Sequence, residues 1–267
     1  MYIKSIELSN FRNYEYLSME FHPEKNILYG DNAQGKTNIL EALYYCGMMK
    51  SHKGSKEKEI IKLNEKEAHI RMLIEKKGVT RKIDMHLKRS KPKGVAIDGI
   101  PIRRSSELIG LVNIVFFSPE DLGIIKHGPS GRRRFLDMEL CQLDRVYYHD
   151  LAKYNKVMEQ RNNLLKQITY DQSLLPTLDI WDEQLVEYGC RIIRRREKHM
   201  EQLNEVIASI HHKLSGGKEK LVLGCEFSTS VSSFRTMLEK NREKDLYQKV
   251  TLSLIHISEP TRQEAIS

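Results

Sequence analysis

The sequence contains few cysteines, and their positions argue against two common kinds of site. The four thiols lie at least 35 positions apart, at Cys46, Cys141, Cys190 and Cys225. Without a CxxC pair, neither a cysteine-based zinc site nor a disulfide framework is expected, and buried or idle thiols are the simpler interpretation. The ten histidines show no HExxH pattern, which argues against a zinc protease as well.

Long apolar runs are missing too. No stretch approaches the roughly 18 apolar residues of a transmembrane helix. The N-terminus lacks the basic and then apolar layout of a signal peptide, so a cytoplasmic protein is expected. With 40% hydrophobic and 30% charged residues in 267, the composition is that of a folded chain with one large domain, or one domain with an added lobe.

Positive charge is concentrated in one segment. Residues 51–104 carry 16 Lys or Arg against 7 Asp or Glu, whereas residues 1–50 carry 5 against 6 and residues 105–267 carry 23 of each. The whole net charge of +8 therefore comes from this segment. Such a field would attract a polyanion such as nucleic acid, but lysine-rich surfaces that only keep a chain soluble are common, and charge alone favours that interpretation.

Hydrophobic periodicity predicts a mixed chain that begins with strands and continues with helices. Ser118 and Pro119 carry the signals of a helix start. Strands are predicted at residues 3–8, 14–21, 26–29, 68–74, 79–87, 95–102, 111–117 and 221–227, and helices at residues 37–49, 132–168 (with or without a break), 179–214 and 234–245. The basic segment is thus expected to be mostly antiparallel hairpins, with turns at residues 77–78 and 98–99.

One motif carries chemistry, between the predicted strand at 26–29 and the helix that follows. It fits the pattern G-x-x-x-x-G-K-[ST] of the phosphate-binding P-loop. The glycines allow a tight turn whose backbone N–H groups cradle phosphate oxygens, the lysine reaches the β- and γ-phosphates of ATP, and the threonine hydroxyl ligates Mg²⁺. The predicted cofactor-binding residues are Gly30, Asp31, Asn32, Ala33, Gln34, Gly35, Lys36 and Thr37, with Thr37 as the metal ligand.

The second half of an ATPase site is not evident. A further carboxylate at the end of an apolar strand should help to hold Mg²⁺. Glu120, Asp121 and Glu226 are the available candidates, and all are poor fits. Residues 214–218 resemble the LSGGQ signature of ABC-type ATPases, but a working signature begins a helix and this one is predicted to end one as a glycine C-cap.

Three further groups allow more than one interpretation. Arg132, Arg133 and Arg134 fit phosphate contacts and a basic helix turn equally well. Residues 194–196, all arginine, are predicted to lie on a solvated face with i,i+4 pairs. Trp181 is predicted to pack between helices together with Leu178, Leu185 and Tyr188, instead of stacking on a base.

Several segments resemble the RecF family of bacterial DNA replication and repair proteins. The similar segments occur in the family's order and cover roughly residues 1–250. They are residues 1–14, the P-loop with residues 38–42, and residues 51–53, 117–122 and 131–137.

This resemblance implies an α/β fold, a P-loop ABC-type (SMC-like) ATPase head with antiparallel β hairpins and a helical second lobe. It also implies ATP and Mg²⁺ as cofactors and an ATP-dependent homodimer. The implied function is binding single-stranded and gapped double-stranded DNA, together with RecR and RecO, to help load RecA.

The chain departs from the family at its C-terminal end. Family members continue into a part that carries the signature and the second carboxylates, whereas residues 253–267 resemble no part of the family and are expected to be a non-native tail. The expected division is an ATP-binding lobe at 1–125, a helical lobe at 126–215, an incomplete return to the first lobe at 216–252, and the tail. ATP turnover is therefore not expected.

Two other classes of function stay open from the residues alone. A small-molecule or nucleotide kinase would use the same P-loop, with arginines around an acceptor pocket and little affinity for DNA. A non-catalytic interaction module would bind partners without turnover. Salt-dependent DNA binding distinguishes a RecF-like protein from a kinase. An ATPase assay distinguishes a RecF-like ATPase from a non-catalytic interaction module.

Overall fold

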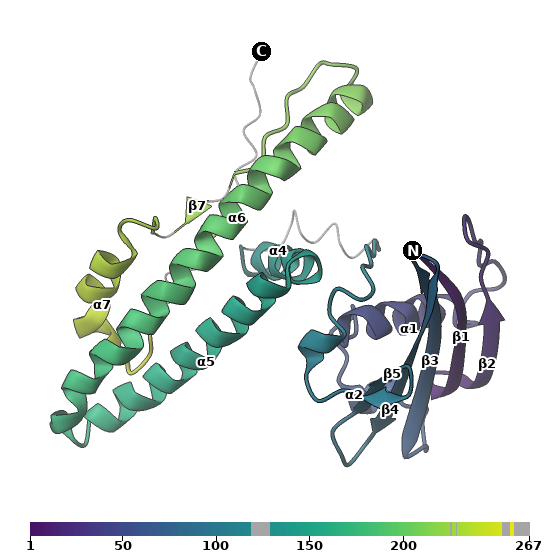
Figure 1. Cartoon of the computed structure of the whole chain (residues 1–267), viewed down its shortest axis with the longest axis horizontal. Coiled ribbons are helices and arrows are strands. Elements are labelled where there is room, and N and C mark those ends of the chain that lie inside the picture. The colour runs from purple at the N-terminus through teal and green to yellow at the C-terminus, as the bar shows by residue number, and fades with distance from the viewer. Residues whose placement is uncertain (119–128, 225, 228, 253–256, 259–267) are drawn as a thin grey trace. The chain divides into compact units, whose positions relative to one another are not determined.

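The chain forms two compact units, residues 1–116 and 117–267, in a computed structural model (Figure 1). The structure describes residues 1–118, 129–224, 226–227, 229–252 and 257–258. Among these, no helix is long and apolar enough to cross a membrane.

The first unit is built on a six-stranded antiparallel sheet with the order β2-β1-β3-β4-β5-β6. Its strands are β1 (Tyr2–Phe11), β2 (Tyr14–Glu20), β3 (Glu67–Lys76), β4 (Val79–Lys88), β5 (Gly94–Ile97) and β6 (Ile100–Pro101). The two predicted hairpin turns are confirmed, because Lys77 and Gly78 both have positive φ, as do Asp98 and Gly99. Two consecutive positive φ values give the turn whose twist matches that of the flanking strands.

Helix α1 (Lys36–Met48) belongs to the core of this unit together with the sheet (Figure 1). Burial alternates along β3, where Ile70, Met72 and Ile74 are fully buried and their neighbours are not. The helix contributes its own buried side chains, among them Tyr45 and Cys46. This alternation is the period-2 pattern that predicted the hairpins. Two short helices, α2 (Glu57–Ile60) and η1 (Ser105–Glu107), complete the regular elements.

Two predicted strands of this part of the chain are wrong. Residues 26–29 have no strand, and Ile27 and Tyr29 are 83% and 90% exposed. Residues 111–117 form a single bridge from Val112 to Ile109, with Val115 largely exposed. A strand needs a neighbouring backbone for its hydrogen bonds, and no described strand lies beside either segment. The helix start predicted at 118–119 falls at the edge of residues 119–128, outside the described part.

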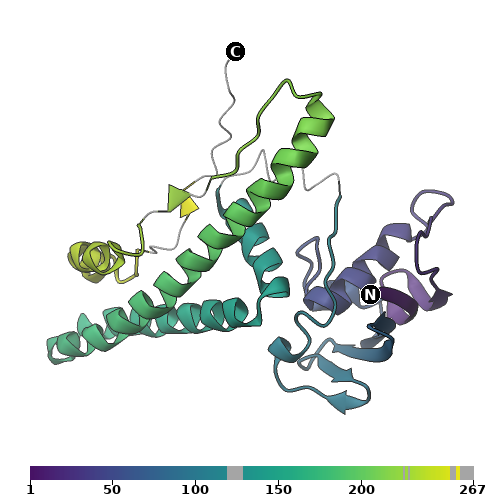
Figure 2. The same cartoon turned by 45° about the horizontal axis from the view of Figure 1, so that its top comes forward.

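The second unit is mainly helical, with α5 and α6 forming a long hairpin (Figure 2). Its elements are α4 (Pro129–Leu143), α5 (Arg145–Ile168), η3 (Gln172–Thr177), α6 (Leu178–Ser215), α7 (Phe234–Gln248), and the paired two-residue strands β7 (Glu226–Phe227) and β8 (Ile257–Ser258). The helix predicted over 132–168 divides at Asp144, whose carboxylate accepts hydrogen bonds from the backbone N–H groups of Val146 and Tyr147 and so caps α5.

Three boundaries in this unit differ from or refine the predictions. Between the helices predicted at 132–168 and 179–214, where no regular element was predicted, residues Gln172–Thr177 form the 3₁₀ helix η3. The strand predicted at 221–227 shrinks to β7, because residues 221–224 take no regular structure. Of the segment expected to be a non-native tail, only Ile257–Ser258 is described, as β8.

The end of α6 confirms the predicted glycine C-cap. Gly216 adopts a left-handed conformation with φ 63°, and its N–H and that of Gly217 both donate to the His212 carbonyl oxygen. This pattern satisfies carbonyl groups that the end of a helix leaves without partners. The LSGGQ-like sequence at 214–218 therefore closes a helix here instead of beginning one.

Packing between the helices also confirms the role predicted for Trp181. The indole contacts two buried clusters, and Leu178 and Leu185 on the same helix are buried within them. The solvated face predicted for residues 194–196 is wrong for Arg196, which is 1% exposed. Its guanidinium donates to Asp137 and to the hydroxyl of Tyr147 and joins α4, α5 and α6. The helical periodicity and the charge of residues 194–196 do not show which of the three arginines faces α4 and α5.

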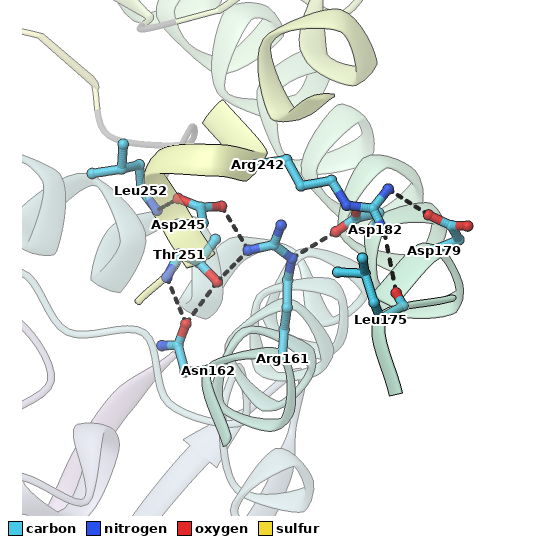
Figure 3. A network of polar contacts seen from close by, with 9 residues as sticks. All are labelled: Arg161, Asn162, Leu175, Asp179, Asp182, Arg242, Asp245, Thr251 and Leu252. Atoms are coloured by element: carbon cyan, nitrogen blue, oxygen red, sulfur yellow. Dashed lines mark hydrogen bonds and ion pairs between the residues drawn. The ribbon is translucent and has the colours of Figure 1, made fainter. Parts of the chain in front are cut away.

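A second buried arginine connects α5, α6 and α7 (Figure 3). Arg161 Nε lies 2.6 Å from Asp182 Oδ1, and Nη1 lies 2.7 Å from Asp245 Oδ2 and 2.9 Å from Thr251 Oγ1. Asn162 Oδ1 accepts from the backbone N–H and the hydroxyl of Thr251. Charge-assisted hydrogen bonds thus hold α7, and the residues after it, on the helical hairpin.

Candidate functional site

The predicted P-loop, residues 30–37, leads directly into α1. Gly30 and Gly35 have φ of 134° and 96°, and Gly35 is the N-cap residue of the helix. These angles strain residues with a Cβ, so both glycines are required by the path of the backbone. Ala33 also has positive φ, at 65°, which costs about 1–2 kcal/mol for an L-residue. The loop is therefore a bent segment whose shape depends on its glycines.

The N-terminus of α1 has the features of an anion site. No side chain caps it, and the backbone N–H groups of Asn38 and Ile39 bond to the Gly35 carbonyl oxygen. Among the described residues, the backbone N–H groups of Lys36 and Thr37 have no acceptor. Unpaired N–H groups and the positive end of the helix dipole suit a phosphate group.

The two polar side chains predicted to act on the nucleotide lie at this helix start. Lys36 Nζ donates to the carbonyl oxygens of Gly30 at 2.7 Å and Asp31 at 2.5 Å, which places the ammonium group against the first turn of the loop. Thr37 is exposed in the first turn of α1. A cation at the loop and an accessible hydroxyl beside it fit the phosphates of ATP and a Mg²⁺ ion, respectively.

The turn that joins β1 to β2, taken with its two flanking residues as residues 11–14, touches the loop. Asn13 Nδ2 and the Tyr14 hydroxyl both donate to the Gln34 carbonyl oxygen, each at 3.3 Å. Asn13 Oδ1 accepts from Asn38 Nδ2 at 2.8 Å. The sequence indicated this turn only as part of the family resemblance and gave its side chains no role.

A buried ion pair fixes α1 one turn further on. Arg12 forms two hydrogen bonds with the fully buried Glu41, at 2.8 and 2.6 Å, and Ser51 donates to the same carboxylate at 2.6 Å. Burial alone would raise the pKa of Glu41, but hydrogen bonds from Arg12 and Ser51 and the charges of Arg12 and His52 outweigh it and hold that pKa below its usual value. The sequence could not show this pair, since its members are 29 positions apart.

Many basic side chains of the segment 51–104 are bonded to other groups of the same unit. Seven of its sixteen basic side chains bond to carboxylates or carbonyl oxygens: Lys62, Arg71, Lys76, Arg81, Lys82, Arg89 and Lys93. Lys93, for example, donates to the Met49 carbonyl oxygen at the end of α1 and pairs with Glu57. Eight others are exposed: Lys53, Lys56, Lys58, Lys66, Lys77, Lys91, Arg103 and Arg104. The positive surface is thus about half of what the sequence count implied.

The candidates for a second carboxylate are not brought to the loop by any described contact. Glu120 and Asp121 lie outside the described residues, and Glu226 belongs to β7 of the other unit. Within the described part of the chain, no group of three or more His, Cys, Asp or Glu could hold a metal ion. Thr37 remains the one predicted metal ligand that the structure places at the loop. Arg132 to Arg134 lie in the first half of α4, also in the second unit.

Comparison with known proteins assigns this architecture to a class. A family model described as the RecF/RecN/SMC N-terminal domain matches residues 2–237. The antiparallel sheet with a P-loop helix, followed by a helical unit, is the ATPase-head fold of that class, as predicted.

Within this class, the chain belongs to the RecF family of DNA replication and repair proteins. It is 62% identical to the DNA replication and repair protein RecF of Lachnoclostridium phytofermentans over 251 residues, which cover 94% of this chain and 70% of that protein. The RecF protein of Agathobacter rectalis is 57% identical over 246 residues, covering 92% and 68%.

Solved structures agree with this assignment. A structure described as the recombination mediator protein RecF with ATP, in the RecFOR pathway, has a TM-score of 0.90 and 34% identity and covers 96% of this chain and 71% of that one. A second structure of RecF, with the ligand named ATPrS, has a TM-score of 0.87 and 35% identity over the same shares.

Proposed function

We propose that this chain binds ATP with Mg²⁺ through residues 30–37, as the nucleotide-binding part of a RecF protein. The observation that carries the proposal is the glycine-bent loop at an uncapped helix start, with Lys36 and Thr37 beside it. The related structures named for RecF with ATP support it. Bound nucleotide would supply the charge and the contacts that promote assembly into an ATP-dependent homodimer.

The chain's own groups would divide the work of holding the nucleotide. Backbone N–H groups at the start of α1 donate to phosphate oxygens, and the Lys36 ammonium neutralises their charge. The Thr37 hydroxyl would be a ligand of Mg²⁺. Gly30 and Gly35 allow the backbone to approach the phosphates closely because they have no Cβ.

The second part of the proposal concerns DNA. As a RecF protein, this chain would act on single-stranded and gapped double-stranded DNA with RecR and RecO, to help RecA loading. The exposed basic side chains of residues 51–104 support polyanion binding, because each phosphate contact releases a condensed counterion. Membership of the RecF family argues against the small-molecule kinase alternative.

The proposed division of labour follows the expected lobes. Residues 1–125 would hold ATP and present the basic hairpins, and residues 126–215 would form the helical lobe, on which α7 packs. A cytoplasmic location fits a role on chromosomal DNA. For ATP, the proposal covers binding alone, and we predict that this chain does not hydrolyse it.

Binding of a fluorescent ATP analogue with Mg²⁺ tests the nucleotide proposal. We expect saturable binding by the wild-type chain and a loss of at least about tenfold in affinity for Lys36→Ala. Lys58→Ala, an exposed lysine in the same unit, is the matched control and should bind as wild type. Equal affinity of the wild type and Lys36→Ala would contradict the proposal.

Two further measurements test the remaining parts. Binding to gapped and single-stranded DNA should weaken steeply as salt rises, and binding that does not depend on salt would contradict a role for the basic surface. Phosphate release should stay at background. Release that Lys36→Ala abolishes would show that the chain turns over ATP.

A further inference from the structure

We infer that Asn13 and Tyr14, in the turn between β1 and β2, are positioning residues that hold the phosphate loop in its binding shape. Neither residue belongs to the P-loop motif. The inference rests on the proposed ATP binding. It identifies the part of the sheet that sets the geometry of the phosphate loop.

The first observation is the close approach of the turn to Gly35. A Cβ built on Gly35 would lie 2.7 Å from the Asn13 amide atoms and 2.7 Å from the Tyr14 hydroxyl oxygen. The turn therefore packs directly on the N-cap position of α1. Gly35 is required at that position for its backbone angle and also for this contact.

The second observation is that the side chains of Asn13 and Tyr14 share one hydrogen-bond acceptor. Asn13 and Tyr14 both donate to the Gln34 carbonyl oxygen, so two donors fix one carbonyl group. In a planar trans peptide, the C=O and the following N–H point in opposite directions. Holding the Gln34 carbonyl against the turn therefore directs the Gly35 N–H away from it. An N–H whose direction is set before the ligand arrives costs less to order on binding.

The third observation is that the turn is itself anchored. The Arg12 backbone N–H donates to the Ile60 carbonyl oxygen, and the Arg12 guanidinium holds Glu41 of α1. Asn13 also accepts from Asn38 in the first turn of α1. The turn thus contacts the loop and its helix at Gln34, Asn38 and Glu41, and a shift of one would strain the others.

Affinity for ATP with Mg²⁺ tests this inference with single substitutions. Tyr14→Phe removes the hydroxyl and keeps the ring, and Asn13→Ala removes the amide. We expect each to weaken ATP binding about 3- to 10-fold, because each removes one of the two hydrogen bonds to the Gln34 carbonyl oxygen, and Asn13→Ala also removes the acceptor of Asn38 Nδ2. Tyr16→Phe, two residues further along β2 and exposed, and Asn113→Ala, an exposed asparagine of the same unit, are the matched controls and should bind as wild type.

Asn13→Asp distinguishes positioning from simple packing. The aspartate keeps an oxygen for Asn38 Nδ2 but places a second oxygen against the Gln34 carbonyl. We expect it to bind ATP at least as weakly as Asn13→Ala, with an unchanged melting temperature. Wild-type affinity of Asn13→Asp and Tyr14→Phe would overturn the inference.

Hydrogen exchange keeps the inference testable apart from ATP binding. The backbone amides of residues 33–39 should exchange faster in Asn13→Asp and Tyr14→Phe than in the wild type and the two controls. If the wild-type chain bound no ATP, the proposed function would fail while faster exchange still supported the role of the turn. If ATP bound and neither affinity nor exchange changed, the inference would fail while the proposed function stood.

Discussion

Individual residues of the first unit carry constraints that their neighbours do not share. Gly35 meets the turn at residues 11–14 with no room for a Cβ, whereas Gly54, also at positive φ, has nothing within 4 Å of a built Cβ. Glu41 is likewise set apart, because it is a fully buried carboxylate whose charge is met by Arg12 and by the Ser51 hydroxyl. A buried charge is stable only with such partners.

Replacing Glu41 with Gln should reduce stability in a pH-dependent way. The pKa of Glu41 is lower in the folded chain than its usual value of 4.5, so its ionised form favours folding. That contribution is complete above the unfolded pKa and is lost as pH falls through the folded pKa. We expect Glu41→Gln to lower the free energy of unfolding by about 1–3 kcal/mol at neutral pH, and by less with increasing acidity.

Chemical denaturation at several pH values between about 3 and 7 measures this difference. Glu15→Gln is the matched control, because Glu15 is exposed in a surface pair with Lys62, and it should change stability by less than about 1 kcal/mol. A loss for Glu41→Gln that is the same at all pH values would contradict the electrostatic explanation.

At the scale of elements, helix packing in the second unit depends on two kinds of contact. α6 presents Gly189 to Phe234 of α7, and a Cβ on this glycine would lie 2.5 Å from the phenylalanine ring. Further along α7, Arg161 of α5 ties Asp245 to Asp182 of α6 (Figure 3). One contact is a close apolar fit and the other is a buried charge network.

Gly189→Ala should loosen α7 from the hairpin. The added methyl group must displace the Phe234 ring, and overpacking of this kind costs about 1–3 kcal/mol. Gly131→Ala, in α4 with open space around it, is the matched control and should be neutral or stabilise by up to about 1 kcal/mol through helix propensity. Thermal unfolding compares the two variants. Equal effects would show that Phe234 does not fill the space above Gly189.

Arg161→Met should be more damaging than any change at an exposed arginine. It leaves Asp182 and Asp245 in a buried position without their cation, which costs about 3–5 kcal/mol. Arg194→Met, an exposed position on α6, should change stability by less than about 1 kcal/mol. The measurement is the midpoint of urea unfolding followed by helical circular dichroism, and similar midpoints for the two variants would contradict the network's role.

At the scale of the whole molecule, the two units have separate hydrophobic cores. One buried cluster lies entirely within residues 1–116, and the other two lie entirely within residues 117–267. Because each cluster of described residues is confined to one unit, we expect the effects of substitutions in different cores to add.

We expect the units to respond separately to core substitutions. Ile70→Ala removes a fully buried side chain of β3 at a cost of about 2–5 kcal/mol, and it should speed hydrogen exchange in the sheet while α5 and α6 stay protected. Arg161→Met should do the reverse. Hydrogen exchange followed by mass spectrometry resolves the two units, and joint loss of protection in either variant would contradict separate folding.

The sequence was informative where a pattern is local. The P-loop spacing located the loop and the start of α1, the alternation in residues 68–87 located a hairpin, and the glycines after Leu214 located the end of α6. Each of these depends on backbone angles or on side chains within a few positions, which the local sequence determines.

It was misleading where long-range partners decide the outcome. Residues 26–29 and 111–117 have strand composition but no described neighbour to complete a ladder. Arg196, one of three arginines in a row, is buried because Asp137 and Tyr147 of other helices meet it. The contact of Asn13 and Tyr14 with Gln34 likewise joins positions about 20 residues apart.

By itself, then, the sequence determined the family, the phosphate loop and most of the helices and hairpins, because these depend on short-range spacing and on turn residues. Only the tertiary structure decided which charges are buried in pairs, which basic side chains remain on the surface, and which turn supports the loop. Those outcomes depend on burial and on contacts between segments far apart in the chain, where the free energy of a polar group is set by the partners that the fold brings to it.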